Sequence, residues 1–161
     1  MMPALTAHGA TIPTIGFGTS QLGAAQPGDF TDAVAAALEL GYRHIDTAWK
    51  YGSEPSVGKG IKKSGVPRHE IFLTTKVSHE YLRAADFARS VEESLTRLQT
   101  DYVDLLLVHW PTIDNIPLAE TMGALAKAKR EGKTRFIGVA NFNIALLDEA
   151  MRLCPEQFSV L

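Results

Sequence analysis

Apolar residues recur along the chain with two different spacings, which alternate from the N-terminus towards the C-terminus. Short, extended and mostly apolar runs predict strands at residues 14–19, 43–47, 71–76, 103–108 and 134–140. Between these runs, apolar residues at helical spacing predict helices at residues 30–40, 54–64, 84–98, 118–130 and 144–153. Strand and helix therefore alternate over most of the sequence.

Residues at the expected ends of these elements support the assignment. Asp29 or Thr31 can cap the first helix, and Asn143 can cap the last one. Near the N-terminus, a turn dipeptide between two short extended pieces predicts a hairpin over residues 5–12. At the other end, residues 158–161 have the composition of an opening sixth strand.

Strands that alternate with helices through short connections form parallel sheets with right-handed crossovers. Two architectures have this pattern, a closed (β/α) barrel and an open, doubly wound sheet. A doubly wound dinucleotide-binding fold usually opens its first helix with G-x-G-x-x-G, and residues 16–21 lack the third glycine. The sequence therefore favours an α/β fold of the (β/α)8 TIM-barrel type.

The length of the chain limits how much of such a barrel it holds. Its 161 residues are enough for one packed core, whereas a complete (β/α)8 barrel takes about 250 residues. We therefore expect one domain over residues 1–161, a partial barrel that runs from the hairpin and the first strand to the start of the sixth. The open sheet edges of a partial barrel predict self-association.

Composition and charge exclude several classes of protein. The net charge of -2 leaves no broad cationic surface for nucleic acid or anionic lipid. No apolar run approaches the length needed to cross a membrane, and the N-terminus lacks the pattern of a secretory signal. The single cysteine, Cys154, cannot form an internal disulfide, and no metal-ligand spacing is present. We expect a cytoplasmic protein without a metal site.

Polar side chains stand at or just after the ends of successive predicted strands: Asp46, Tyr51, Lys76 and His109. The C-terminal strand ends form one rim of a (β/α) barrel, and catalytic groups collect there. When a carbonyl is reduced, negative charge grows on its oxygen, so the site needs a proton donor aimed at that oxygen. This set of residues suits a carbonyl reductase.

Tyr51 is the candidate proton donor. An ammonium about 4 Å from a phenol stabilises the phenolate by up to about 4 kcal/mol at an effective dielectric constant of about 20, and Lys76 can supply that charge. Asp46 on the neighbouring strand would keep Lys76 charged and fixed in position. His109 can donate a neutral N–H to the carbonyl oxygen and so orient it.

Each of these residues also has a purely structural interpretation. Asp46 can cap the loop that follows it, Tyr51 can pack as a loop aromatic, and Lys76 can end its strand in solvent. His109 follows an apolar strand, where a histidine is commonly buried with its hydrogen bonds satisfied. The coincidence of all four on one rim is what favours the catalytic interpretation.

Longer motifs around these residues resemble those of a known family. They are GYRHIDTA (41–48), YG (51–52), SGVPR (64–68), TK (75–76), DYVD (101–104), HWP (109–111) and GVANF (138–142). Over essentially its whole length, the chain resembles the aldo-keto reductases, and most of all the bacterial 2,5-diketo-D-gluconate reductases. This resemblance implies NADPH-dependent reduction of small aldehydes and ketones on an eight-stranded barrel, with the four rim residues as the catalytic set.

The same resemblance implies further contacts with the cofactor and the substrate. Thr19, Ser20 and Asp46 would lie near the cofactor, and Asn141 would bind the nicotinamide carboxamide. Trp110 would line the substrate pocket. The structural alternatives are capping of strand ends for Thr19, Ser20 and Asn141, and core packing for Trp110.

The chain departs from the common family pattern at three positions. Ser20 stands where an aromatic residue is frequent, Ala140 where a serine helps to hold the carboxamide, and Ser53 where an asparagine often precedes Glu54. Lys50, next to Tyr51, either favours anionic keto-acid substrates or is an exposed loop lysine.

Two other functions compete with carbonyl reduction. Lys76 could act as a Schiff-base nucleophile of a lyase or aldolase, although Asp46 should keep it charged and therefore un-nucleophilic. The other alternative is an inactive barrel fragment with at most a binding or regulatory role.

Overall fold

The computed structural model describes residues 3–7, 9–20, 28–112 and 115–154. At the N-terminus, β1 (Ala4–Ala7) and β2 (Ala10–Pro13) pair as an antiparallel hairpin, at about the positions where the sequence predicts one. Gly9 at the turn has a φ of 82°, a conformation that glycine adopts without steric cost. His8, the other residue of the turn dipeptide, lies outside the described residues.

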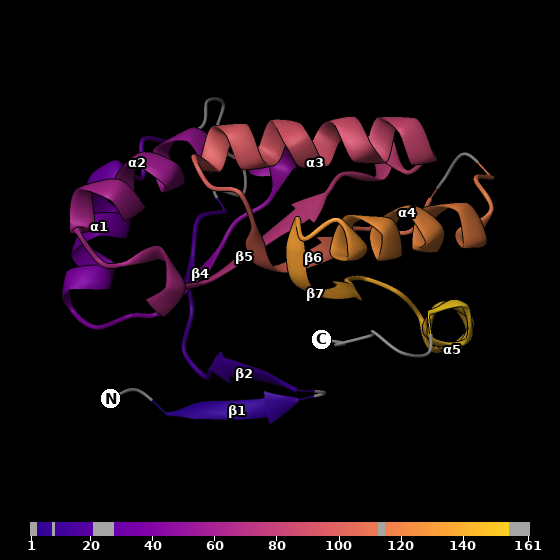
Figure 1. Ribbon diagram of the computed structural model, residues 1–161, viewed down its shortest axis with the longest axis horizontal. Coiled ribbons are helices and arrows are strands. Elements are labelled where there is room, and N and C mark those ends of the chain that lie inside the picture. Colours follow the sequence, from indigo (N-terminus) through magenta and orange to yellow (C-terminus); the bar gives the residue numbers. More distant parts are fainter. Residues whose placement is uncertain (1–2, 8, 21–27, 113–114, 155–161) are drawn as a thin grey trace.

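A parallel sheet carries the rest of the fold, as Figure 1 shows. Its five strands, in spatial order, are β3 (Phe17–Gly18), β4 (His44–Asp46), β5 (Phe72–Val77), β6 (Val103–Val108) and β7 (Thr134–Val139). The helices between strands are α1 (Thr31–Glu39), α2 (Glu54–Ser64), α3 (Ala84–Leu98) and α4 (Leu118–Arg130), and α5 (Ile144–Leu153) follows β7. Spatial order equals chain order, as in a (β/α) barrel, whereas a doubly wound sheet reverses its order. The predicted α/β fold class is confirmed.

The first predicted strand is wrong at its start. It was expected over residues 14–19, but β3 covers only Phe17–Gly18. The backbone N–H and the hydroxyl of Thr14 both donate to the carbonyl of Pro3, at 3.0 and 2.9 Å, so this residue continues the hairpin instead. The sixth strand expected at residues 158–161 lies outside the described residues.

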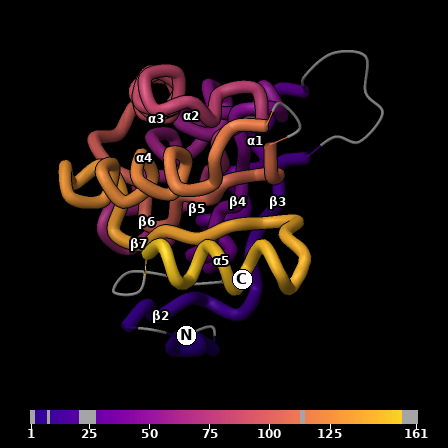
Figure 2. Tube along the Cα trace, turned by 90° about the vertical axis from the view of Figure 1, so that its right-hand side faces the viewer, coloured from indigo at the N-terminus to yellow at the C-terminus, as the bar shows by residue number. Residues whose placement is uncertain are grey.

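The helices pack against one another in chain order, from α1 to α5, and α1 to α4 cover one face of the sheet (Figures 1 and 2). Their buried side chains meet the sheet in the main core, which includes Leu38, Phe87, Leu125, Leu73 and Ile137. On the opposite face, Phe72, Leu105 and Leu107 form a second cluster, against which Ile12 of the hairpin packs. Both β5 and β6 are buried on both faces, and β6 is accordingly apolar except for Asp104, whereas β5 also buries Thr74, Thr75 and Lys76.

Two glycines let α2 lie very close to its neighbouring helices. A Cβ atom at Gly58 would be 2.7 Å from the carbonyl oxygen of Leu98 at the end of α3, and one at Gly60 would be 2.7 Å from that of Thr31 in α1. No side chain fits at either position without displacing backbone. This packing fixes α2, whose first turn directly follows the segment that carries Tyr51.

The first and last helices begin in different ways. The carboxylate of Asp29, one position before the Phe30 N-cap of α1, accepts from the backbone N–H of Thr31 at 2.9 Å. Hydrogen bonds from the side chain and then the backbone of Thr31 lower the pKa of Asp29. The side-chain oxygen of Asn143 accepts from the N–H of Leu146, also at 2.9 Å. Asn143 is therefore confirmed as the cap of the last helix. The capping expected from Asp29 or Thr31 at the first helix is wrong, because Phe30 holds the N-cap position of α1 and makes no side-chain cap hydrogen bond.

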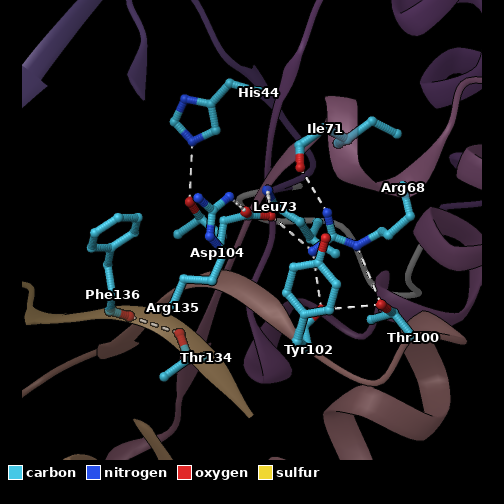
Figure 3. Close-up of polar contacts among 11 residues, drawn as sticks. His44, Arg68, Ile71, Leu73, Thr100, Tyr102, Asp104, Thr134, Arg135 and Phe136 are labelled. Carbon is cyan, nitrogen blue, oxygen red and sulfur yellow. Dashed lines mark hydrogen bonds and ion pairs between the residues drawn. The ribbon is translucent and has the colours of Figure 1, made fainter. Parts of the chain in front are cut away.

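A buried carboxylate joins three strands near their N-terminal ends (Figure 3). Asp104 on β6 accepts from the N–H of Leu73 at 3.0 Å and pairs with Arg68 and Arg135, each at 2.8 Å. The guanidinium of Arg68 also lies over the ring of Tyr102, 4.2 Å from its centre. A structural role for this end of the strands suits a (β/α) barrel, in which chemistry takes place at the opposite, C-terminal ends.

Candidate active site

At the C-terminal ends of β4 and β5, Lys76 and Asp46 form a tight ion pair. The Lys76 Nζ is 2.6 Å from Oδ1 of Asp46 and donates a second hydrogen bond to the carbonyl of Thr47 at 2.9 Å. The side chain of Lys76 is only 9% exposed and that of Asp46 35%. A buried ammonium needs a charged or carbonyl partner, and here the neighbouring strand supplies both.

Tyr51 lies beside this ion pair on a short 3-10 turn, η1 (Trp49–Tyr51). This turn follows β4 after the two residues Thr47 and Ala48. Gly52 ends the turn with a φ of 68°. The Nζ of Lys76 lies over the Tyr51 ring, 5.1 Å from its centre. This arrangement brings a phenol and an ammonium together at the rim, as the sequence predicted.

His109 completes the group from the end of β6. Its backbone N–H donates to the carbonyl of Val77 at 3.0 Å, which keeps it in register with β5. Its ring meets the Tyr51 ring edge-to-face, with 5.5 Å between centres and an interplanar angle of 81°. Partial burial, followed by the positive charge of Lys76, lowers the pKa of His109 from 6.5 to about 4. The imidazole is therefore neutral near pH 7 and holds one N–H donor.

All four rim residues predicted from the sequence thus lie in one cluster. The contacts run from Asp46 to Lys76, from Lys76 to the Tyr51 ring, and from that ring to His109. The cluster combines a phenol, a fixed positive charge and a neutral imidazole. Such groups can protonate a carbonyl oxygen and stabilise the charge that grows on it.

Thr19 lies in a buried network of hydroxyl groups below the rim. It is 1% exposed, and its side-chain oxygen bonds to the carbonyl of Asp46 at 3.2 Å and to the Ser53 hydroxyl at 3.0 Å. The Thr47 hydroxyl joins Ser53 from the other side at 3.1 Å. The Thr19 hydroxyl therefore bonds within the protein and links the end of β3 to β4. This arrangement corresponds to the structural alternative for Thr19, the capping of a strand end.

The other residues expected to contact ligands lie at the surface of the same rim. Ser20 is exposed. The backbone of Asn141 is left-handed, with a φ of 62°, and its side-chain amide donates to the carbonyl of His109 at 2.8 Å. Trp110 is 50% exposed, so the core-packing alternative for it is wrong.

Glu54, for which the sequence predicted no role in the site, is a fully buried carboxylate in the first turn of α2. It accepts from the Thr75 hydroxyl at 2.7 Å and lies 3.6 Å from Arg97 of α3. Burial raises the pKa of Glu54, and the hydrogen bond from Thr75 partly offsets this. The signal in the sequence is a charged residue one turn after Tyr51, in the position of a helix start.

Lys50 forms an ion pair with Glu80 at 2.8 Å and is about half exposed. Of its two interpretations from the sequence, the structure shows an exposed loop lysine whose charge is matched by a neighbouring carboxylate.

Among the described residues, no group of three or more His, Cys, Asp and Glu side chains is arranged to hold a metal ion. None of the helices in these same residues has the length and apolar character of a membrane span.

Comparison with known proteins gives consistent matches. The model of the Aldo/keto reductase family matches residues 14–159. Methylglyoxal reductase DkgB of Escherichia coli O157:H7 is 48% identical over 141 residues, which cover 87% of this chain and 52% of that protein. An aldo-keto reductase of Mycolicibacterium vanbaalenii is 46% identical over 143 residues, 89% of this chain and 50% of the relative. The chain therefore spans about half the length of these curated relatives.

Solved structures share the fold as well. A putative 2,5-diketo-D-gluconic acid reductase B superposes with a TM-score of 0.88 at 49% identity, over 95% of this chain and 53% of the other. An aldo-keto reductase of Bombyx mori, solved in complex with NADP, has a TM-score of 0.85 at 37% identity, over 94% and 54% of the two chains. The parallel sheet and its order are therefore those of the aldo-keto reductase barrel. Together with the family match over residues 14–159, they show that the chain belongs to the aldo/keto reductase family.

Proposed function

We propose that this chain carries the proton-transfer centre of a reductase that converts small aldehydes and ketones to alcohols with NADPH. The observation that carries the proposal is the ammonium of Lys76, held 2.6 Å from Asp46 and placed over the Tyr51 ring. Because the chain spans about half of its relatives' length, the activity is proposed for the protein that contains this rim.

In the proposed reaction, the carbonyl oxygen of the substrate lies between the Tyr51 hydroxyl and the His109 ring. His109, neutral because its pKa is about 4, donates its N–H to this oxygen and orients it. A nicotinamide held at this rim would supply the hydride for the carbonyl carbon. Tyr51 gives its proton to the oxygen as the C–O double bond becomes single, and the product is the alcohol.

The phenolate left on Tyr51 needs a nearby positive charge. Lys76 provides it at no cost of reorganisation, since Asp46 and the Thr47 carbonyl hold the ammonium in place before the reaction. The nearly complete burial of Lys76 strengthens this interaction, because water screens it less. Asp46 thus acts through Lys76, while Lys76 acts on Tyr51.

The exposed rim residues suit a nicotinamide cofactor. The amide of Asn141 has a donor and an acceptor, the complement of a carboxamide, and its left-handed backbone and bond to His109 fix it at the rim. We propose Asn141, Ser20 and Asp46 as cofactor contacts. Thr19 would contribute by supporting Asp46 from below, since its hydroxyl is already bonded within the protein.

Two features bear on the substrate. The relatives are named for reduction of methylglyoxal and of 2,5-diketo-D-gluconic acid, which are both small carbonyl compounds. The charge of Lys50 is matched by Glu80, so this lysine does not provide an unpaired cation for a carboxylate. We propose small carbonyl compounds as substrates, with the exposed Trp110 as one wall of their site.

The test is NADPH consumption with methylglyoxal, followed by absorbance, for the unchanged protein and for Tyr51→Phe. We expect the variant to lose turnover while its far-UV circular dichroism stays the same, because only the hydroxyl is removed. Tyr102→Phe is the matched control, since Tyr102 lies at the opposite end of the strands beside Arg68 and should keep full activity. Unchanged turnover in Tyr51→Phe would remove Tyr51 from the mechanism.

The competing functions make different predictions. A Schiff-base lyase needs a neutral amine, and the carboxylate 2.6 Å from Lys76 favours the ammonium; borohydride trapping of a substrate adduct would reveal such chemistry. A binding or regulatory role without turnover predicts no NADPH consumption, and fluorescence titration with NADPH then measures whether the cofactor binds. The cytoplasmic location, the single domain over residues 1–161 and the self-association remain predictions, the last to be tested by light scattering.

A further inference from the structure

The three consecutive residues of η1 face two different parts of the protein, because Trp49 and Lys50 both contact the short turn η3 (His79–Tyr81) and Tyr51 faces the rim. The ring of Trp49 meets Tyr81 edge-to-face, with 4.7 Å between centres, and Lys50 pairs with Glu80 at 2.8 Å. Tyr51 instead faces Lys76 and His109. In a 3-10 turn, successive side chains point about 120° apart. Trp49 can therefore pack against Tyr81 and Arg97 while Tyr51, two positions later, points in another direction, towards Lys76 and His109.

Arg97 of α3 also contacts the Trp49 ring. Its guanidinium carbon lies over the ring, 5.1 Å from the centre, and the indole N–H points at Glu93 with 3.4 Å between the nitrogen and the carboxylate oxygen. Glu93 also pairs with Arg97, at 3.6 Å. The ring is therefore fixed from α3 by a cation over its face and a carboxylate at its edge.

The same arginine is linked to the strand that carries Lys76. Arg97 lies 3.6 Å from the buried carboxylate of Glu54, which accepts from the Thr75 hydroxyl at 2.7 Å. Thr75 directly precedes Lys76 on β5 and points to the helix side, while Lys76 points to the rim. One chain of contacts thus connects the backbone of the proposed proton donor with that of its charged partner.

We infer that Trp49, held by its contacts with Arg97 and Tyr81, is the positioning residue that sets the Tyr51 phenol against His109 and Lys76. We call Trp49, Tyr81 and Arg97 the Trp49 clamp. The role of the clamp in catalysis rests on the proposed function, whereas its contacts are present in the structure whatever the function is. In this inference the three residues act on Tyr51 through the η1 backbone and not on the substrate.

The position of the Tyr51 ring can be measured without any turnover. Because the ring meets His109 edge-on, its ring current shifts the NMR signals of the His109 imidazole, and Tyr51→Leu gives the unshifted position. In Trp49→Leu and in Arg97→Gln we expect these signals to move to the Tyr51→Leu position. Trp49→Phe keeps an aromatic face for Arg97 and Tyr81 and should keep the signals of the unchanged protein.

Arg89→Gln is the matched control on the same helix. Arg89 pairs with Asp86 and, at 4.0 Å, with Glu93, but is not in contact with the Trp49 ring in the described part of the chain. This variant should leave the His109 signals in place, which separates the clamp from a general weakening of α3. If Trp49→Leu and Arg97→Gln also leave them in place while the proteins stay folded, the inference is overturned.

Turnover provides a second measurement in protein that shows NADPH-dependent reduction. Loss of the clamp should lower kcat by about 10-fold to about 100-fold, as expected for a catalytic group displaced by about 1 Å, with little change in the KM for NADPH. Signals that move in protein without turnover would support the clamp and count against the proposed function. Equal losses in Arg89→Gln and Arg97→Gln would overturn the clamp alone.

Discussion

Acidification should destabilise this protein through the ring of His109. Its pKa in the folded chain is about 4, against an ordinary value of 6.5, because burial and the charge of Lys76 disfavour the imidazolium. Between these two values the unfolded chain binds the proton more readily than the folded chain. The free energy of unfolding therefore falls as the pH falls through this window. The contribution of His109 is complete above pH 6.5 and is lost as the pH approaches 4.

The size of the effect follows from the shift. At about 1.4 kcal/mol per pKa unit, the full displacement corresponds to a ceiling of about 3 kcal/mol. His109 is only partly buried, so solvent screening reduces the expected contribution to about 1 to 2 kcal/mol. Roughly half of this should be lost between about pH 7.5 and about pH 5.

Urea denaturation at a series of pH values, for the unchanged protein and for His109→Gln, measures this contribution. Glutamine keeps an N–H donor but does not titrate, so the difference between the two free-energy curves isolates the imidazole. His44, whose pKa is also lowered mainly by burial, is present in both proteins and cancels from the difference. Two curves that stay parallel from neutral to acid pH, or a difference of opposite sign, would refute the reasoning.

Further predictions concern stability, measured as the free energy of unfolding in urea. Gly60→Ala should cost about 1 to 3 kcal/mol, because its Cβ would lie 2.7 Å from the Thr31 carbonyl oxygen. Gly123→Ala, with open space at the same atom, should instead stabilise α4 by up to about 1 kcal/mol; effects of equal sign would contradict the packing argument. Asp104→Asn should cost about 3 kcal/mol, since it removes a buried carboxylate that pairs with the partly buried Arg68 and with Arg135. Asn143→Ala should cost about 1 kcal/mol by removing the α5 cap, and no loss would mean that the cap is dispensable.

The periodicity of the sequence was a good guide to the elements and a poor guide to one boundary. The strand predicted over residues 103–108 has the same bounds as β6, because a short apolar run bounded by turn residues is typical of a buried strand. The first strand was predicted too long, since Thr14 and the residues after it look extended in either setting. Its two hydrogen bonds to Pro3, a residue eleven positions away, assign it to the hairpin, and no local pattern encodes that choice.

The site shows the same division. That Asp46, Lys76 and His109 share one rim follows from chain order, because each ends a strand of a parallel sheet. The sequence did not reveal that the Thr19 hydroxyl is buried. Nor did it reveal the Trp49 clamp, whose members come from two short turns and a helix and meet only after α3 packs onto the sheet.

The sequence by itself determined which residues form strands and helices, the parallel order of the sheet, and the edge at which chemistry takes place. These features depend on the spacing of apolar residues along the chain, and the period of that spacing predicts them directly. Tertiary structure alone decided the 2.6 Å contact of Lys76 with Asp46, the neutral state of His109 and the support of Tyr51 through Trp49 and Arg97. Each of these depends on burial and on contacts between atoms from distant parts of the chain. The interaction energy of such atoms changes strongly when their separation changes by one or two ångströms.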